Sequence, residues 1–367
     1  MVIAPSTPQE LAECLAEANL RNRRITLCGN STKNMMAGPI EPSDVTVSTS
    51  ALSGVLEYNP RDLTISVGAS ITYCELARVL AEHRQMVPLD PPFSDRATVG
   101  GSLAANVSGP RRRLYGSGRD LVIGMTFATL EGKLVKTGGM VVKNAAGLDM
   151  AKLMIGSFGT LAAIATVNFR VHPMPPGTRT FVQEFQRIDD VIAARNQVLQ
   201  SRLQPAAIDI LKSGPSFQLL IQAGASPVVL DRYSRELAAA QVLEGAEEES
   251  LWQNVRELTP RFLRENSNGA VLRVSCQLAE VGPVLQDLPR QALARAGSGV
   301  CYGYFPDADA LRFPRIGHTV VEFAPQDFRE KHVLWRQPGD DFAMMKGVKD
   351  MFDPNGLLNS GRLYGRI

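Results

Sequence analysis

Residues 97–139 read ATVGGSLAANVSGPRRRLYGSGRDLVIGMTFATLEGKLVKTGG, and residues 143–173 read KNAAGLDMAKLMIGSFGTLAAIATVNFRVHP. These two runs decide the fold, because glycines recur in them beside small or β-branched residues and because they end on the apolar run Leu161–Val171. Glycine lacks a Cβ and tolerates positive φ, so such a backbone can bring its N–H groups close to an anionic or planar ligand. The spacing alone predicts either a ligand site of this kind or a set of tight turns in an ordinary α/β domain.

Four motifs resemble the flavin-binding core of the FAD-dependent oxidoreductases of the vanillyl-alcohol oxidase type, the PCMH-type FAD-binding domain. They are Thr98–Ala104 (TVGGSLA), Tyr115-Gly116 with Arg119-Asp120, Lys143–Asp149 (KNAAGLD) and Gly156–Leu161 (GSFGTL). Within that superfamily the chain is most similar to the FAD-binding subunits E of bacterial glycolate oxidase.

The resemblance implies an α+β fold. Its first part is a PCMH-type FAD-binding domain of two α+β subdomains with FAD between them, and the sequence allows a division at about Pro60. A reduced ferredoxin-like cap domain follows, and a C-terminal tail returns to the flavin domain. A Rossmann fold is not expected, because no Gly-x-Gly-x-x-Gly follows a first strand with an acidic residue some 20 positions on.

Composition and charge exclude several classes of protein. The chain has 367 residues, of which 44% are hydrophobic and 21% charged, as is ordinary for a soluble globular protein. A net charge of +2 gives no electrostatic signature for binding nucleic acid or an anionic membrane. No apolar run approaches the ~20 residues that span a bilayer, and the N-terminus lacks signal-peptide features. We therefore expect a cytoplasmic protein with no direct membrane insertion, attached at the inner face of the plasma membrane only through partners.

The cysteines argue against an internal metal centre. The five of them are scattered, with no Cys-x-x-Cys, whereas an iron–sulfur or zinc site needs several thiolates at short spacing. If electrons leave a flavin here, another chain has to accept them.

The N-terminal segment predicts a helix, a strand and a phosphate loop. Thr7, the proline after it and Glu10 form a capping box for a helix to about Leu20. The strand Ile25–Cys28 then runs into Gly29–Asn34, whose amides and hydroxyls can hold phosphate oxygens. The resemblance makes this the pyrophosphate loop of FAD, and an unoccupied turn is the alternative.

The resemblance assigns FAD-binding roles to residues in every motif. These residues are Gly29, Asn30, Ser31, Thr32, Lys33, Pro88, Asp90, Thr98, Gly100, Gly101, Ser102, Ala104, Gly109, Lys143, Gly156, Gly159, Ile164, Asn359 and Arg362. Lys143 would stabilise the anionic reduced flavin near its N1 atom, and Ile164 would meet the adenine end. The tail residues Asn359 and Arg362 would either contact the flavin or only stabilise the chain end.

Two positions depart from the common family form Gly-Ser-Glu-Gly-Thr-Leu-Gly. Phe158 replaces the glutamate and Ala162 replaces the last glycine, so the turn should persist without the carboxylate's hydrogen bond. No histidine or cysteine is well placed for a covalent flavin link, although Cys28 lies close to the loop. We therefore expect FAD to bind non-covalently.

The second half of the chain changes pattern after a proline-rich linker at residues 172–177. The expected domains are residues 1–173, which bind FAD, residues 178–335, the cap, and residues 340–367, which pack back on the FAD domain. The cap should contain strands at 181–185, 207–211, 217–221 and 270–276, with helices at 188–201 and 230–243. Two charged runs are interpreted as solvated: Glu247-Glu248-Glu249 as a helix start rather than a metal site, and Arg111-Arg112-Arg113 as a loop. The alternative for the arginines is a surface that holds an acidic partner or steers an anionic substrate.

No catalytic residue and no metal site is predicted. Family members that oxidise 2-hydroxy acids carry histidines in a Gly-Asp-Gly-Asn-Leu-His-type motif of the cap, and this chain has four histidines and no such motif. The resemblance therefore implies an FAD-binding subunit of a multi-subunit glycolate oxidase that converts glycolate, or D-lactate, to the 2-oxo acid. Its partners would be a larger FAD-containing subunit, which does the chemistry, and an iron–sulfur subunit that passes electrons to quinone.

Two alternatives stay open. One is a self-sufficient FAD-dependent 2-hydroxy-acid dehydrogenase, which would need a base among His318, His332, Arg315 or Tyr304. The other is a structural subunit that keeps the fold without the flavin.

Overall fold

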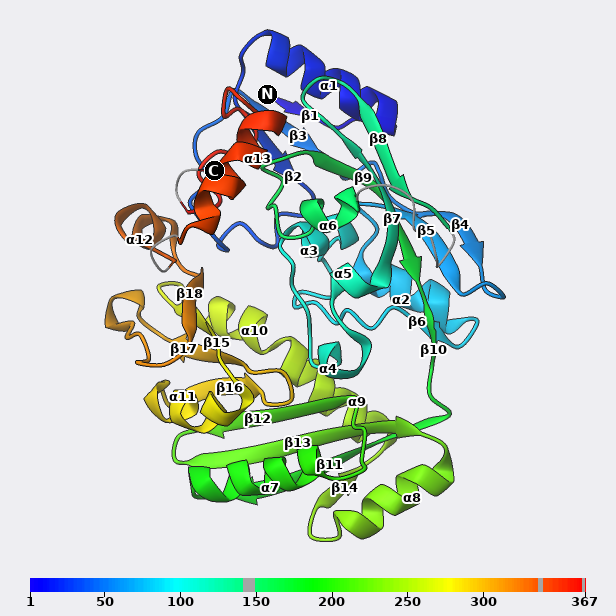
Figure 1. Ribbon diagram of the computed structural model, residues 1–367, viewed down its shortest axis with the longest axis vertical. Helices are drawn as coiled ribbons and strands as arrows, with labels where there is room; N and C mark the ends of the chain where they lie inside the picture. Colours follow the sequence, from blue (N-terminus) through cyan, green and yellow to red (C-terminus); the bar gives the residue numbers. More distant parts are fainter. Residues whose placement is uncertain (141–148, 336–338, 365–366) are drawn as a thin grey trace. The chain divides into compact units, whose positions relative to one another are not determined.

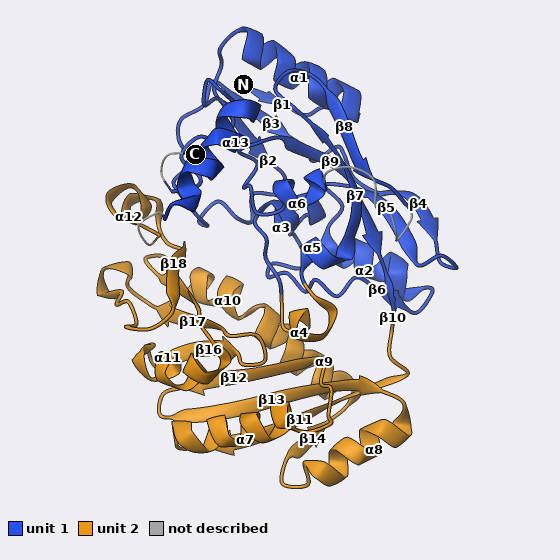
Figure 2. Ribbon diagram, viewed as in Figure 1, with its two compact units in different colours: residues 1–108, 117–173, 337–367 blue, residues 109–116, 174–336 orange. Residues whose placement is uncertain are grey.

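The computed structural model describes residues 1–140, 149–335, 339–364 and 367. The chain divides into two compact units (Figure 2). Unit 1 comprises residues 1–108, 117–173 and 337–367, and unit 2 comprises residues 109–116 and 174–336. The glycine-rich stretch is therefore interrupted, since its loop 109–116 belongs to unit 2.

Unit 1 contains three sets of paired strands and the helices that cover them (Figure 1). Its elements are β1 (Val2–Ile3), α1 (Pro8–Leu20), β2 (Ile25–Cys28), β3 (Val45–Ser48), β4 (Val55–Asn59), β5 (Thr64–Gly68), α2 (Tyr73–Ala81), β6 (Gln85–Met86), α3 (Val99–Ala104), α5 (Gly118–Leu121), β7 (Val122–Ala128), β8 (Leu134–Gly138), α6 (Met150–Met154), β9 (Ala163–Arg170), β10 (His172–Pro173) and α13 (Asp341–Phe352).

The two main sheets of unit 1 differ in direction. The first is parallel, in the order β1-β3-β2, and the second is antiparallel, in the order β4-β5-β9-β7-β8, while β10 pairs with β6. Because β4 pairs with β5, the change from the first sheet to the second falls between Ser48 and Val55 and not at Pro60. Pro60 lies in the turn between β4 and β5, where the Asn59 side chain donates a hydrogen bond to Asp62 at 2.5 Å. Proline here shapes a hairpin turn rather than a linker.

The first helix has the predicted N-cap at Thr7, but its capping box differs at one bond, because Glu10 accepts from Ser6 rather than from Thr7. The Thr7 side chain accepts a hydrogen bond from the Glu10 N–H at 3.1 Å, and the Glu10 carboxylate accepts one from the Ser6 N–H at 2.7 Å. Leu11 and Leu15 are fully buried in the same core cluster as the strands β2 and β3. A helix whose apolar positions recur every three to four residues thus covers the parallel sheet.

Unit 2 is built on one antiparallel sheet of eight strands with the order β14-β11-β13-β12-β16-β17-β15-β18. Its elements are α4 (Arg112–Tyr115), β11 (Gly177–Phe185), α7 (Ile188–Gln200), β12 (Ala207–Ser213), β13 (Ser216–Ala225), α8 (Pro227–Glu236), β14 (Gln241–Leu243), α9 (Gly245–Arg256), α10 (Leu258–Glu265), β15 (Ala270–Ser275), η1 (Leu278–Glu280), α11 (Val281–Asp287), β16 (Gln291–Arg295), β17 (Val300–Phe305), η2 (Ala308–Ala310), β18 (His318–Phe323) and α12 (Gln326–Lys331).

The sheet of unit 2 consists of two halves with the same strand order. In the first half, β11, α7, β12, β13, α8 and β14 follow the ferredoxin-like β-α-β-β-α-β pattern, with the fourth strand next to the first. The second half repeats this order with β15, α11, β16, β17 and β18, although a short 3-10 helix stands where the second helix would be. The halves join where β12 pairs with β16. The predicted ferredoxin-like character is therefore present, and it occurs twice.

One predicted helix of unit 2 is too long. The sequence predicts a helix over residues 230–243, but α8 ends at Glu236 and Gln241–Leu243 forms the edge strand β14. Val242 pairs with Phe181 of β11. The edge of β11 offers backbone hydrogen bonds to this segment, and β-branched Val242 suits a strand, so tertiary pairing overrides the helical pattern.

Glu248 is a buried anchor, which corrects its interpretation as part of a solvated run. Its side chain is 3% exposed and accepts hydrogen bonds from the Thr178 and Thr180 hydroxyls at 2.6 and 2.8 Å. The Trp252 indole N–H donates to the Thr180 hydroxyl at 2.7 Å. These bonds fasten α9 to β11, and no group of metal-ligating side chains is found in the part of the chain that the structure describes.

Replacing Glu248 with alanine should destabilise unit 2 by about 2 kcal/mol, because buried hydroxyl groups lose their acceptor. Glu247→Ala, an exposed neighbour on the same helix, should change the stability by less than ~0.5 kcal/mol. Urea unfolding followed by tryptophan fluorescence measures both, since Trp252 packs on this network. Equal midpoints for the two variants would contradict the anchoring role.

The arginine run is not the predicted solvated loop, since Arg112 and Arg113 begin helix α4 and Arg113 is partly buried. Arg113 donates a hydrogen bond to the Pro205 carbonyl at 3.0 Å, and burial lowers the pKa of its guanidinium. Its side chain therefore ties the loop 109–116 to the rest of unit 2.

Within the described ranges, no helix combines the length and the apolar composition that crossing a bilayer requires.

Candidate functional site

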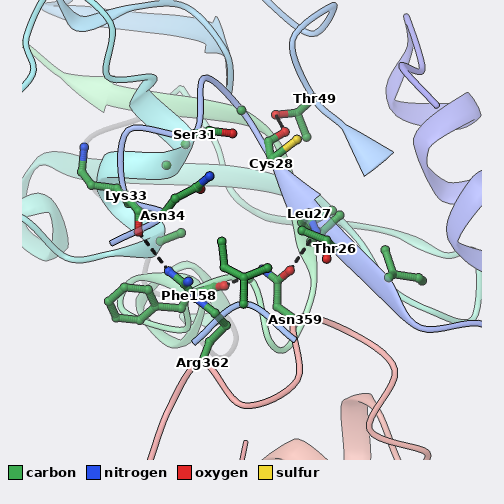
Figure 3. A pocket seen from close by; sticks show the side chains of 18 of the residues that line it. Thr26, Leu27, Cys28, Ser31, Lys33, Asn34, Thr49, Phe158, Asn359 and Arg362 are labelled. Atoms are coloured by element: carbon green, nitrogen blue, oxygen red, sulfur yellow. Dashed lines mark hydrogen bonds between the residues drawn. The ribbon is translucent and has the colours of Figure 1, made fainter. Parts of the chain in front are cut away.

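A cavity in unit 1 gathers segments that lie far apart in the sequence (Figure 3). It encloses about 1090 Å³, including the solvent at its mouth. Its walls are β2 and the loop after it, α3, the turn before β9, and the tail after α13. The cavity therefore combines residues from several separate segments of unit 1.

The cavity brings together most of the predicted FAD-binding residues. Those that line it are Gly29, Asn30, Ser31, Thr32, Lys33, Thr98, Gly100, Gly101, Ala104, Gly159, Ile164, Asn359 and Arg362.

Five of the predicted residues that the structure describes do not line this cavity. They are Pro88, Asp90, Ser102, Gly109 and Gly156. Ser102 is buried within α3, Asp90 lies 3.4 Å from the Tyr73 hydroxyl, and Gly109 belongs to unit 2. Lys143 lies outside the described residues.

The loop after β2 presents backbone donors to the cavity. Among the described residues, the N–H groups of Asn30, Ser31 and Thr32 have no protein acceptor, whereas the Asn34 N–H donates to the Ser31 carbonyl at 3.3 Å. Ser31 has a φ of 55°, and a left-handed residue within a turn orients successive N–H groups toward a common point. Consecutive free amides at a cavity wall fit phosphate oxygens.

Glycine is needed where this loop meets α3. A Cβ on Gly29 would lie 2.9 Å from the Thr98 hydroxyl oxygen, and one on Gly101 would lie at the same distance from it. That hydroxyl caps α3 by accepting a hydrogen bond from the Gly101 N–H at 3.2 Å. Any side chain at Gly29 would therefore push the loop away from the helix and alter the path of its amides.

The tail forms the floor of the cavity by extending the parallel sheet. The Ile25 N–H donates to the Leu357 carbonyl at 2.7 Å, and the Asn359 N–H donates to the Ile25 carbonyl at 2.9 Å. The Asn359 side chain accepts from the Leu27 N–H at 2.8 Å and donates to the Phe158 carbonyl at 2.7 Å (Figure 3). Asn359 thereby joins β2, the turn and the tail, which is the stabilising role considered for it.

Arg362 supplies a buried positive charge to the same wall. Its guanidinium donates to the Lys33 carbonyl at 3.1 Å and lies 5.7 Å from the centroid of the Phe158 ring. The aromatic ring thus takes the place of the family's glutamate and contacts the cation through its face. The charged side chains along the cavity are Arg24, Lys33 and Arg362 against the single carboxylate of Glu41. This balance favours an anionic ligand.

A buried ion pair holds the tail in place. Lys349 of α13 donates hydrogen bonds to the Asp353 carboxylate at 2.5 Å, to the Thr160 carbonyl at 2.8 Å and to the Leu358 carbonyl at 3.1 Å. Asp353 also accepts from the Leu357 and Leu358 N–H groups, each at 2.8 Å. Burial lowers the pKa of Lys349, and the Asp353 carboxylate opposes that shift. The pair links α13, the turn before β9 and the floor of the cavity.

Sequence reasoning missed part of the lining. The missed residues are Arg24, Ile25, Thr26, Leu27, Cys28, Asn34, Ile40, Glu41, Pro42, Ser43, Thr49, Ala69, Ala105, Phe158, Ala162, Ala163, Leu357 and Ser360. Several of them lie directly beside predicted residues in the sequence, and wider motif boundaries would have included those. Residues 40–43 carry no recognisable motif and could not have been found that way.

The side chains considered as a catalytic base differ in their surroundings. His332 stacks on Phe328 with ring centroids 4.0 Å apart, and His318 is exposed at the start of β18. Burial raises the pKa of Tyr304, whose hydroxyl lies 3.0 Å from that of Thr259. A tyrosine with a raised pKa stays protonated near neutral pH and does not accept a proton.

Comparisons with known proteins identify FAD-linked proteins that are similar to this chain. Residues 1–138 match the FAD binding domain family, and residues 329–363 match the C-terminal domain of FAD linked oxidases. Over 361 residues the chain is 28% identical to the glycolate oxidase subunit GlcE of Escherichia coli (strain K12), a match that covers 98% of each chain. It is 25% identical over 212 residues to the glycolate oxidase subunit GlcD of Bacillus subtilis (strain 168), covering 57% of this chain and 45% of that protein.

One further relative and one solved structure are also similar to the chain. A D-lactate dehydrogenase of Anaerostipes hadrus is 27% identical over 213 residues, covering 58% of this chain and 44% of that protein. Among solved structures, an alkyldihydroxyacetonephosphate synthase superposes with a TM-score of 0.71 at 18% identity, covering 98% of this chain and 75% of that one. Together the matches confirm the predicted α+β fold class, the predicted resemblance and FAD as the cofactor.

Proposed function

We propose that this chain is the FAD-binding subunit of a multi-subunit enzyme that oxidises a small 2-hydroxy acid, because it matches two family models of FAD-linked proteins and is similar to a glycolate oxidase subunit. Glycolate is the proposed substrate of the complex, with D-lactate as the second candidate. Two of its relatives are named as glycolate oxidase subunits and a third as a D-lactate dehydrogenase, which supports this substrate class.

The proposal rests on three consecutive backbone N–H groups in the loop after β2, which lines the unit 1 cavity and in which these groups have no acceptor among the described residues. The N–H groups of Asn30, Ser31 and Thr32 would bind the phosphate oxygens of FAD, and the guanidinium of Arg362 would offset their charge. Ala163 and Ile164 provide apolar contacts for a ring. Bound FAD would supply a redox group that carries electrons within the complex. The chain's own residues bind the cofactor, hold it non-covalently and orient it.

We further propose that a larger flavoprotein subunit carries out the oxidation and that an iron–sulfur subunit passes the electrons to quinone. Two features of this chain support that division. The described residues contain no cluster that could bind a metal ion, and the histidines and the tyrosine considered as bases are exposed, stacked or protonated. The five cysteines do not gather into a cluster site either.

Absorption spectroscopy of the purified chain tests the assignment. The chain alone should show a flavin spectrum that anaerobic glycolate or D-lactate does not bleach, whereas the assembled complex should be bleached by its substrate. Bleaching of the isolated chain would make it a self-sufficient dehydrogenase. A chain that lacks flavin, alone and in the complex, would instead be a structural subunit.

A further inference from the structure

Two cysteines of unit 2 lie together at one end of the β15–β17 pair. Val274 pairs with Cys301 in the register of these strands, and one step beyond the pair the Cys276 N–H donates to the Gly299 carbonyl at 2.8 Å. Because side chains alternate along a strand, Cys276 and Cys301 are diagonal neighbours on one face of the sheet. Cys301 is fully buried and Cys276 is partly exposed. A reagent from solvent would therefore meet Cys276 first.

A buried cation lies beside both thiols. Arg195 of α7 is 1% exposed, and its guanidinium donates to the carbonyls of Leu278 and Ala296 at 3.0 and 3.2 Å. Its Nε atom has no hydrogen-bond partner among the described residues, and the ionisable groups that act on it are the two thiols. A cation whose contacts are carbonyl groups favours the thiolate form of a neighbouring cysteine.

The two thiols differ in acidity and in access. The hydrogen bond between them lowers the pKa of Cys276 and raises the pKa of Cys301, and burial of Cys301 acts in the same direction. Burial and the Glu280 carboxylate oppose ionisation of Cys276, while Arg195 favours it. Cys276 is thus suited to attack a small disulfide. Cys301, which is close by and protonated, is suited to attack the resulting mixed disulfide.

We propose that Cys276 and Cys301 are a redox-active dithiol, a modification site that low-molecular-weight disulfides oxidise to a disulfide bond. The Cys276 thiolate attacks one sulfur of the small disulfide, whose S–S bond breaks and releases one thiol. Cys301 then loses its proton, and its sulfur attacks the Cys276 sulfur of the mixed disulfide and releases the second thiol. The two protein thiols are oxidised and the small disulfide is reduced to two thiols. This reaction requires neither FAD nor a partner chain.

Oxidised glutathione, applied to the full chain, is the probe. Two of the five thiols should be oxidised to a disulfide. Mass spectrometry of non-reduced peptides should find Cys276 linked to Cys301, and dithiothreitol should reduce this bond. Cys301→Ala should stop at a glutathione adduct on Cys276, and Cys276→Ser should leave Cys301 unmodified. A link to any other cysteine, or no link at all, overturns the proposal.

The role of Arg195 is tested by the pH profile of alkylation with iodoacetamide. In the wild-type chain, Cys276 should react with a midpoint below that of the exposed Cys74. Arg195→Lys should keep that midpoint, and Arg195→Met should raise it. If Arg195→Met does not fold, as thermal melting would show, the wild-type profile decides, and a Cys276 midpoint at or above that of Cys74 contradicts the attacking role.

Discussion

Asp353→Ala is expected to lower the stability of unit 1 by about 3–5 kcal/mol, the usual cost of removing one partner from a buried ion pair. The Lys349 ammonium would remain buried without its carboxylate, and the Leu357 and Leu358 N–H groups would lose their acceptor. The floor of the cavity should loosen at the same time, so FAD should bind more weakly. Calorimetry of the whole chain measures the loss, and hydrogen exchange of β2 assigns it to unit 1.

The same helix offers a matched control. Lys346 and Asp350 are also four positions apart in the sequence, and their Nζ and Oδ2 atoms form an ion pair at 2.8 Å. Their side chains, however, are 61% and 53% exposed. Asp350→Ala should therefore change the stability by less than ~0.5 kcal/mol. Similar losses for both aspartates would show that burial of the Lys349–Asp353 pair does not matter.

Gly29→Val is expected to weaken FAD binding by about 100-fold or more. The new side chain would collide with Thr98, since even a Cβ would lie 2.9 Å from its hydroxyl oxygen. The loop would shift, and charge-assisted hydrogen bonds from its amides, each worth about 1.5–3 kcal/mol, would be lost. Titration of the apoprotein with FAD, followed by flavin fluorescence, gives the dissociation constants.

Gly347→Val is the control for this substitution. Gly347 lies on α13, and a Cβ there would meet nothing within 4 Å. It should leave FAD binding unchanged. If Gly29→Val binds FAD as tightly as Gly347→Val does, the loop after β2 is not the phosphate site.

Local signals account for the parts of the structure that the sequence predicts well. The Thr7 N-cap of α1 and the strand β2, which leads into Gly29, depend on residues a few positions apart, and both form as expected. Most of the predicted FAD-binding residues converge on one cavity, which is lined by the loop after β2, α3, the turn before β9 and the tail. The identity of the cofactor followed from the combination of motifs rather than from any one of them.

Contacts between distant segments account for what the sequence did not predict. Glu248 has exposed acidic neighbours in the sequence. The hydroxyl groups that it binds, on Thr178 and Thr180, are 70 and 68 positions away. The edge strand β14 forms because β11 is available to pair with it. The repeat in unit 2 is a repeat of strand order, which no local sequence pattern reveals.

The tail that floors the cavity has a consequence for biosynthesis. The bond between Asn359 and Leu27 joins residues 332 positions apart, and closing so long a loop of chain costs conformational entropy. Until residues 357–359 have been synthesised, β2 lacks this neighbouring segment and the cavity has no floor. If FAD binds in this cavity as proposed, its site is completed only after the whole of unit 2 has been synthesised, since unit 2 lies between the two segments in the sequence.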